Sequence, residues 1–274
     1  MSEAWDESAW HALAGELDTW RAEGRVASFW WRDDDAGPPD PALGRLLDLA
    51  ARVGLPLGLA VVPAWLTTDA SARILAAPDA VVVLQHGFAH ANHESQIPAG
   101  ERKVRPAECG AARPLAVVLA EMHAGRERLG LALANRLLPV FVPPWNRIAP
   151  AVLRALPGLG YGAVSTFGPR ITVEPVPGLQ QLNCHADPIA WREAKRFLGS
   201  EATLERLRGH LVDRREGRAD AREPTGLLTH HRDMTPTLWV FLTTLLERLR
   251  AHPGVTFPLL RAVFSPEGGC APFG

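Results

Sequence analysis

The stretch Val26–Asp35, VASFWWRDDD, decides the fold: an apolar run of strand-forming residues ends in a cluster of charge. The same pattern returns along the chain. The apolar run 80–84 leads into Gln85-His86-Gly87, and 140–142 leads into Pro143-Pro144-Trp145. Amphipathic stretches with the spacing of helices separate these runs. Repeated strand–helix alternation predicts a parallel sheet, and about eight such units in one chain favour its closure into a barrel.

The expected elements cover most of the chain. The segment 4–22 predicts an N-terminal helix with Trp10, Leu13, Leu17 and Trp20 on one face. We expect further helices at 41–53, 68–77, 114–137, 149–156, 200–214 and 236–251, and strands at 26–31, 55–62, 80–84, 140–142, 163–166, 179–184, 226–229 and 255–259. The polar segment 91–113 is too long for an idle connection and predicts a lid or binding loop. The whole of 1–274 is expected to form a single domain.

Composition excludes several classes of protein. The chain has 274 residues, is 47% hydrophobic and carries a formal net charge of -1, so nothing indicates nucleic acid or an anionic membrane as a partner. Its three cysteines are widely separated, which argues against a disulfide framework or a zinc knuckle. The acidic start does not resemble a signal peptide, and no apolar stretch is long enough to predict a membrane span. The expectation is a cytoplasmic protein that acts on a small molecule or a glycan, with its oligomeric state undetermined.

The noteworthy polar residues share one position, directly after an apolar strand. In a parallel barrel these strand ends open on the same face, where active sites are built. Adjacent acids such as Asp33–Asp35 repel one another when they are ionised, and a metal ion relieves that repulsion. The alternative is an acidic turn before Pro38. The expectation is therefore a shared site, made up of Asp33, Asp34, Asp35, His86, His90, Trp145, Asp187 and His230.

Two histidine signals accompany the acids. The spacing of His86 and His90 places both imidazoles on one side of a helical turn, within reach of one ion. Carboxylate oxygen with two imidazoles suits zinc, with cobalt, nickel or iron as alternatives. His93 is expected to support the loop. A histidine at a strand end, such as His230, is suited to act as a general acid. In each case the alternative is a histidine with a purely structural hydrogen bond.

Taken together, five motifs resemble the polysaccharide deacetylase family, also called NodB-homology or carbohydrate esterase family four. They stand in the family's order over about 200 residues: Arg32-Asp33-Asp34-Asp35-Ala36-Gly37-Pro38, His86-Gly87-Phe88-Ala89-His90, Val142-Pro143-Pro144-Trp145-Asn146, Asp187-Pro188-Ile189-Ala190-Trp191 and Leu228-Thr229-His230. The resemblance implies a distorted (β/α) barrel of about seven strands. It also implies one divalent metal, held by an aspartate and two histidines.

The resemblance assigns roles residue by residue. Asp34 is the implied general base and Asp35 the metal ligand with His86 and His90, with Asp33/Asp34 as the alternative register. His230 is the implied general acid, oriented by Asp187, while His231 is expected to turn away toward backbone or solvent. Substrate is expected to contact the surfaces formed by Trp145, Trp191, Pro144 and Leu228.

Two departures separate this chain from the family pattern. Position 87 is glycine where the family has Ser or Thr, and the arginine that precedes the Pro-Pro turn is Val142 here. Arg32 and Arg147 are the candidates to replace that arginine. The expected function is removal of an acyl group, acetyl in the simplest case, from the amide nitrogen of a sugar. The alternatives are allantoinase-like cleavage of another C–N bond and a catalytically inactive barrel that binds a glycan or a protein.

Overall fold

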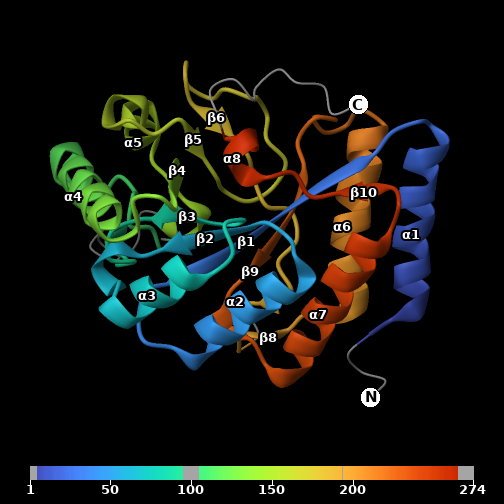
Figure 1. Cartoon of the computed structure of the whole chain (residues 1–274). Coiled ribbons are helices and arrows are strands. Elements are labelled where there is room, and N and C mark those ends of the chain that lie inside the picture. Colours follow the sequence, from blue (N-terminus) through green and yellow to red (C-terminus); the bar gives the residue numbers. More distant parts are fainter. Residues whose placement is uncertain (1–4, 95–104, 193, 265–274) are drawn as a thin grey trace.

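A curled sheet of parallel strands forms the centre of the molecule (Figure 1). The computed structural model describes residues 5–94, 105–192 and 194–264. Within these residues eight strands pair in parallel: β1 Ala27–Ala36, β2 Leu57–Val61, β3 Val81–His86, β4 Leu137–Val142, β5 Ala163–Val164, β6 Gln180–Gln181, β9 Thr225–Thr229 and β10 Val255–Thr256. Strands β1 to β6 follow one another in space, and β9 and β10 both pair with β1.

The sheet is closed between β6 and β9 by isolated backbone bridges rather than by a continuous ladder of strand hydrogen bonds. After β6 the chain bridges Cys184 to Phe167 and then Ala186 to Leu227 of β9. Because β9 pairs in turn with β1, the sheet closes on itself irregularly. The prediction of a distorted (β/α) barrel is confirmed.

Helices cover the outside of the sheet, as Figure 1 shows. Their bounds are α1 Glu7–Ala22, α2 Pro41–Val53, α3 Thr68–Ala76, α4 Leu115–Leu133, α5 Pro150–Ala155, α6 Ser200–Arg215 and α7 Pro236–Ala251, with short 3₁₀ turns η1 Pro63–Trp65, η3 Pro144–Asn146, η4 Pro157–Leu159 and η5 His231–Asp233. Neighbours along the rim are α7, α2, α3, α4 and α5, while α1 packs against α6. No helix in the described part of the chain is long and apolar enough to cross a membrane.

Strand alternation divides the core into two layers. Trp30 and Leu228 point into the barrel with Leu84 and Val142, whereas Trp31 points outward beneath the helices. The short helix α8, Leu260–Val263, contributes to the interior cluster, and Phe264 packs edge-on against Trp30 at 6.0 Å. The two tryptophans face opposite ways because neighbouring side chains on a strand alternate.

Strand β1 is longer than the sequence pattern predicted. We expected it to stop before the acids, but it continues through them to Ala36. The acids are tolerated inside a strand because each binds a partner on its own side of the sheet. The predicted strands 179–184 and 255–259 are shorter than expected, while helix α8 and the hairpin β7 Ile189–Ala190 with β8 Arg196–Phe197 were not predicted.

Candidate metal and acid–base site

Three predicted metal ligands lie together at the carboxyl ends of the strands. Asp35 stands near the end of β1, His86 is the last residue of β3, and His90 lies in the loop that follows. The Nε2 atoms of both histidines are 3.3 Å from Oδ1 of Asp35. Their potential ligand atoms all lie within 4.8 Å of one another. The arrangement brings one carboxylate oxygen and two imidazole nitrogens around a single point.

The chemistry of these donors fits a divalent ion. Nδ1 of His86 lies 2.9 Å from the carbonyl oxygen of Val142, which leaves Nε2 to face Asp35. A hydrogen bond of this kind fixes the ring orientation of a metal-binding histidine. Oδ1 of Asp35 is buried without a well-formed hydrogen bond from any described residue. Burial opposes ionisation of Asp35, but the neighbouring histidines outweigh it and hold the pKa of its carboxyl below the usual value.

The loop from His86 to His90 is not the helical turn that the spacing suggested. Gly87 and His90 have φ values of 57° and 54°, in the left-handed region, and the segment between them is irregular. The expectation of one helical turn is wrong, because these two residues reverse the backbone where a helix would continue it. The loop nevertheless brings the second imidazole back beside the first, with ring centroids 5.1 Å apart.

A buried carboxylate holds this loop in place. Oε2 and Oε1 of Glu108 accept hydrogen bonds from the backbone N–H groups of Phe88 at 3.1 Å and Ala89 at 2.7 Å. A Cβ atom at Gly87 would collide with Oε2 of Glu108. Position 87 is therefore glycine because Glu108 occupies the space beside it. Sequence reasoning missed Glu108, since nothing in the local pattern distinguishes it from a solvated acid.

Backbone strain concentrates around the site. In the described residues six non-glycine positions have positive φ, and four of them are Asp35, His90, Trp145 and Asn146. Such conformations cost roughly 1–3 kcal/mol each and persist only where the surroundings enforce them. The two residues that complete the six, Ala194 and Lys195, lie near Trp191 in the sequence.

Asp34 is held by an arginine from its own strand. The guanidinium of Arg32 forms a bidentate pair with the carboxylate, with Nε–Oδ1 at 2.9 Å and Nη2–Oδ2 at 3.0 Å. Both side chains are almost fully buried. Further donations from Arg32 reach Asn146 Oδ1 at 2.7 Å and Ser165 Oγ at 2.7 Å. Of the two candidates to replace the arginine that is missing at Val142, Arg32 is therefore the one that pairs with Asp34.

Asp33 faces the opposite side of the strand. Its carboxylate accepts hydrogen bonds from Thr229 Oγ1 at 2.6 Å and from the backbone N–H of His231 at 3.1 Å, and its Oδ1 lies 2.5 Å from Nδ1 of His231. His231 begins η5, in line with the expectation that it turns away into the next segment, but the expectation that it bonds to backbone or solvent is wrong. His231 is buried and pairs with Asp33, because the buried carboxylate needs a partner on that side.

His230 lies between two carboxylates on the interior side. Its Nδ1 is 3.7 Å from Oδ2 of Asp187, and its Nε2 is 4.0 Å from Oδ2 of Asp34. Trp191 packs edge-on against the His230 ring at 4.5 Å and donates from Nε1 to Asp187 at 2.7 Å. Burial raises the pKa of Asp187, against the opposing effect of His230. The structure places all four predicted side chains in one contiguous group.

Aromatic rings line the metal side of the site. Trp145 lies 4.3 Å from the ring of His90, and Trp65 approaches the same ring at 5.4 Å. The backbone hydrogen bonds that close η3 are donated by Asn146 and Arg147, so the Trp145 amide takes no part in them. The remaining predicted residues are internal: Pro144 is buried beside Gly87 and Leu228 lies in the barrel interior.

The predicted lid can be followed only at its two ends. Residues 95–104 lie outside the described residues, so the lid remains a prediction. At one end the backbone N–H of His93 bonds to Ala107 O, and no contact of the His93 side chain with the ligands is found among described residues. At the other end Cys109 bridges to Ile148, and Arg147 donates to Pro106 O at 2.7 Å. These contacts place 105–109 in the wall of the site.

A second group of potential ligands lies outside the barrel wall. His185, His210 and Glu223 are fully enclosed, and their donor atoms lie within 4.8 Å of one another. The two imidazoles stack with centroids 3.4 Å apart and planes inclined by 13°. Lone pairs in nearly parallel ring planes cannot converge on one ion at about 2.0–2.1 Å from each nitrogen. The group is better described as a buried polar network that ties α6 to β9.

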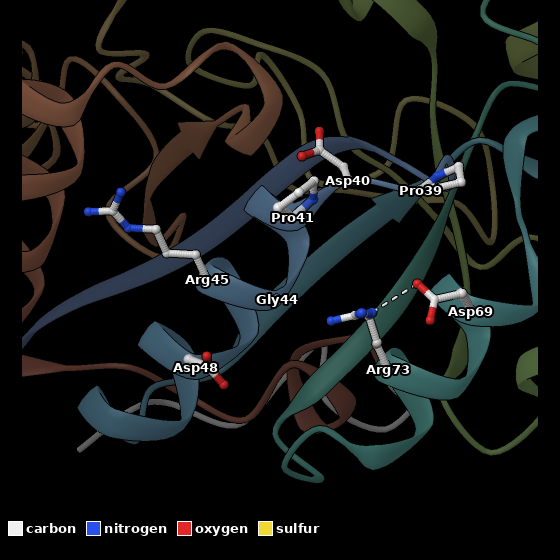
Figure 2. Close-up of a pocket in the computed structure, with 8 residues that line it drawn as sticks. All are labelled: Pro39, Asp40, Pro41, Gly44, Arg45, Asp48, Asp69 and Arg73. Carbon is white, nitrogen blue, oxygen red and sulfur yellow. Dashed lines mark hydrogen bonds and ion pairs between the residues drawn. The ribbon is translucent and has the colours of Figure 1, made fainter.

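A surface pocket of about 540 Å³ lies between α2 and α3 (Figure 2). Its charged residues include Asp69 and Arg73, which pair at 2.9 Å, together with Asp40, Arg45 and Asp48. None of the predicted site residues lines it. The pocket is a groove between two helices, and its charged lining consists of three aspartates and two arginines.

The fold has close counterparts among solved structures. A Mycobacterium smegmatis protein described as a polysaccharide deacetylase aligns with a TM-score of 0.61 and 15% identity, covering 88% of this chain and 89% of that one. A family 4 carbohydrate esterase from Streptomyces lividans, in complex with acetate, aligns with a TM-score of 0.52 and 15% identity, covering 89% and 95%.

The fold is that of the family 4 carbohydrate esterases. A pseudoenzyme of the same family from Bacillus anthracis also matches, with a TM-score of 0.50 and 12% identity over 84% of this chain and 62% of that one. No family model and no curated protein matches the sequence. The likeness therefore concerns the fold, which active and inactive proteins share, and any activity must be argued from the site itself.

Proposed function

We propose that the protein is a metal-dependent hydrolase that removes an acyl group, in the simplest case acetyl, from an amide nitrogen of a sugar-type substrate. The single observation that carries the proposal is the division of labour between neighbouring carboxylates. Asp35 points to two histidines, while Asp34 is paired with Arg32 and lies 4.0 Å from His230. A binding module has no need of an ion site beside a separate buried acid–base pair.

The metal would be held by Asp35, His86 and His90, and zinc is the best match to this donor set. A divalent ion there supplies Lewis acidity and lowers the pKa of a bound water. Asp34 accepts the proton of the water that attacks the acyl carbon, and Arg32 keeps its carboxylate oriented during that transfer. We assign stabilisation of the oxygen on which negative charge develops to the backbone N–H of Trp145, a contribution of roughly 3 kcal/mol for one such donor.

His230 completes the reaction by donating a proton to the departing nitrogen. An amine leaves poorly as an anion, so the C–N bond breaks only as this proton is transferred. Oδ2 of Asp187 lies 3.7 Å from Nδ1 of His230, a position from which it would orient the imidazole ring for this transfer. The balanced products are a carboxylate and a free amine, formed from the amide and one water.

The aromatic walls support a sugar as the group that carries the amide. Trp145 stands beside His90 and Trp191 beside His230, so a ring bound between them would meet both halves of the catalytic group. Flat aromatic faces bind the apolar C–H faces of sugar rings.

The test is acetate release by metal-loaded protein from a panel of N-acetyl sugars, paired with metal analysis. We expect one bound ion per chain and turnover that is abolished in Asp34→Asn without loss of metal. Asp48→Asn, on the exposed side of α2, is the matched control and should behave as wild type. If Asp34→Asn keeps wild-type turnover, the assignment of the base is wrong.

The same experiment tests the alternative that the barrel is catalytically inactive and binds a glycan or a protein. Solved structures with this fold include pseudoenzymes, so the fold alone does not predict activity. Bound metal with no acetate release from any N-acetyl sugar, and no cleavage of a cyclic amide, would favour the binding protein over the enzyme.

A further inference from the structure

Beside the site lie three arginines that form no ion pair with a carboxylate of the described residues. Arg147 follows η3 directly, two residues after Trp145, and Arg192 follows Trp191. Arg105 precedes Pro106, whose carbonyl accepts a hydrogen bond from Nη1 of Arg147 at 2.7 Å. Two of the three arginines therefore belong to the segments that carry Trp145 and Trp191, the aromatic residues that contact His90 and His230.

The positive charges of Arg105, Arg147 and Arg192 are not neutralised by a neighbouring described carboxylate. Burial, followed by the charges of Arg105 and Arg192, lowers the pKa of Arg147. No carboxylate of the described chain stands within ion-pair distance of any of the three. Elsewhere on this surface Arg232 pairs with Asp40 and Lys195 with Asp233. Three neighbouring cations without a counter-charge repel one another, and an anion bound among them relieves that repulsion.

The geometry of Arg147 suits such an anion. A guanidinium carries five N–H donors, and the bond to Pro106 uses only one side of it. The bond also fixes the side chain, which is half-buried, so little freedom is lost when a ligand binds. Planar donor pairs of this kind bind carboxylate and phosphate oxygens in bidentate fashion.

We propose that the substrate carries an anionic oxygen group, a carboxylate or a phosphate, which Arg147 binds beside the acyl amide with support from Arg105 and Arg192. This inference rests on the proposed deacetylation, and it narrows the substrate from N-acyl sugars in general to acidic ones. The neutral sugar would still fit the aromatic walls but would leave the arginines without a counter-charge.

The experiment compares three substrates on zinc-loaded protein at fixed ionic strength. These are N-acetylglucosamine, its 6-phosphate for the phosphate arm, and N-acetylmuramic acid for the carboxylate arm. We expect kcat/KM to be at least about 10-fold higher for one of the acidic sugars. Arg147→Gln should remove about 10- to 100-fold of that preference, chiefly through KM, the range for a lost charged hydrogen bond. The neutral sugar should change little.

Arg154→Gln, exposed on α5, is the matched control for the change of net charge. Equal kcat/KM for all three sugars, or equal losses in the two variants, overturns the proposal. If no sugar is turned over, the proposed deacetylation fails, and calorimetry with inorganic phosphate then decides the anion site. Binding to wild type that Arg147→Gln weakens supports it, and absent or unchanged binding overturns it. Arg192→Gln replaces Arg147→Gln if the latter does not fold.

Discussion

Replacing Gly87 by serine tests the explanation for the glycine in the metal loop. A Cβ at this position collides with Oε2 of Glu108 and lies 2.5 Å from Cγ of Pro144, whereas real Cβ atoms keep at least 3.0 Å. Its φ of 57° adds the left-handed penalty, about 1–2 kcal/mol for a residue with a side chain. Overpacking costs a further ~1–3 kcal/mol. Gly87→Ser should therefore lower the free energy of unfolding by about 2–5 kcal/mol.

The control separates backbone strain from collision. Gly178 also has positive φ, 77°, but a Cβ there meets nothing within 4 Å. Gly178→Ser should cost only the left-handed penalty of about 1–2 kcal/mol. Denaturant unfolding of the metal-free protein measures both variants, and metal analysis shows whether the loop still binds an ion. Equal losses in the two variants would contradict the role assigned to Glu108.

The double variant makes the test sharper. Glu108→Ala leaves the N–H groups of Phe88 and Ala89 without their acceptor, a loss of about 3 kcal/mol or more for two bonds to a charged group. Combined with Gly87→Ser, it removes the collision with Glu108, although not the one with Pro144, and lets the serine hydroxyl accept from the loop. The two changes should then cost about 1–3 kcal/mol less together than the sum of the single variants. Additivity within about 0.5 kcal/mol would refute the reasoning.

Three further outcomes are expected. Arg32→Gln should lower the free energy of unfolding by about 3–5 kcal/mol, because it strands the buried Asp34 carboxylate; a loss below about 1 kcal/mol would argue against the pair. His230→Ala should reduce the turnover of an amide substrate by about 10²–10⁴-fold and that of an activated aryl ester much less. His231→Ala should chiefly destabilise the protein, because it leaves the buried Asp33 carboxylate without its imidazole partner. Burial, with the charges of His185 and Arg214, lowers the pKa of His210 from 6.5 to about 2. The free energy of unfolding should therefore keep its full His210 contribution above pH 6.5 and lose about 2 kcal/mol of it at pH 5, because the unfolded chain binds the proton first. Urea titrations over this pH range should show a flatter decline for His210→Asn.

The sequence predicted that the side chains of the site would lie close together, because strand ends converge. In a parallel barrel, residues that follow successive strands meet whatever their separation in the chain. That rule was enough to bring Asp35, His86 and His90 together, although 55 positions separate the first from the last. Alternation along a strand likewise separates Trp30 from Trp31, and it separates Asp34 from Asp33.

The failures have a common cause, which is contact between distant segments. Glu108 and Gly87 explain each other only when both are seen in place, and no local pattern connects them. The burial of His231 follows from the direction of Asp33, which depends on β1 continuing through its acids. The spacing of His86 and His90 suggested a helix because periodicity carries no information about backbone reversal at positive φ.

The Arg32–Asp34 pair also has a consequence for how this barrel can change over generations. Arg32 and Asp34 stand two positions apart on one strand, so a single short segment carries both residues. The two-residue repeat of the strand alone sets their relative geometry. From the turn after β4, Arg32 receives one contact in the described structure, the side-chain oxygen of Asn146. Insertions or substitutions in that turn can therefore reshape the pocket while the Arg32–Asp34 pair stays intact. The same two positions offer a compact graft for other parallel barrels whose turns are occupied with different tasks.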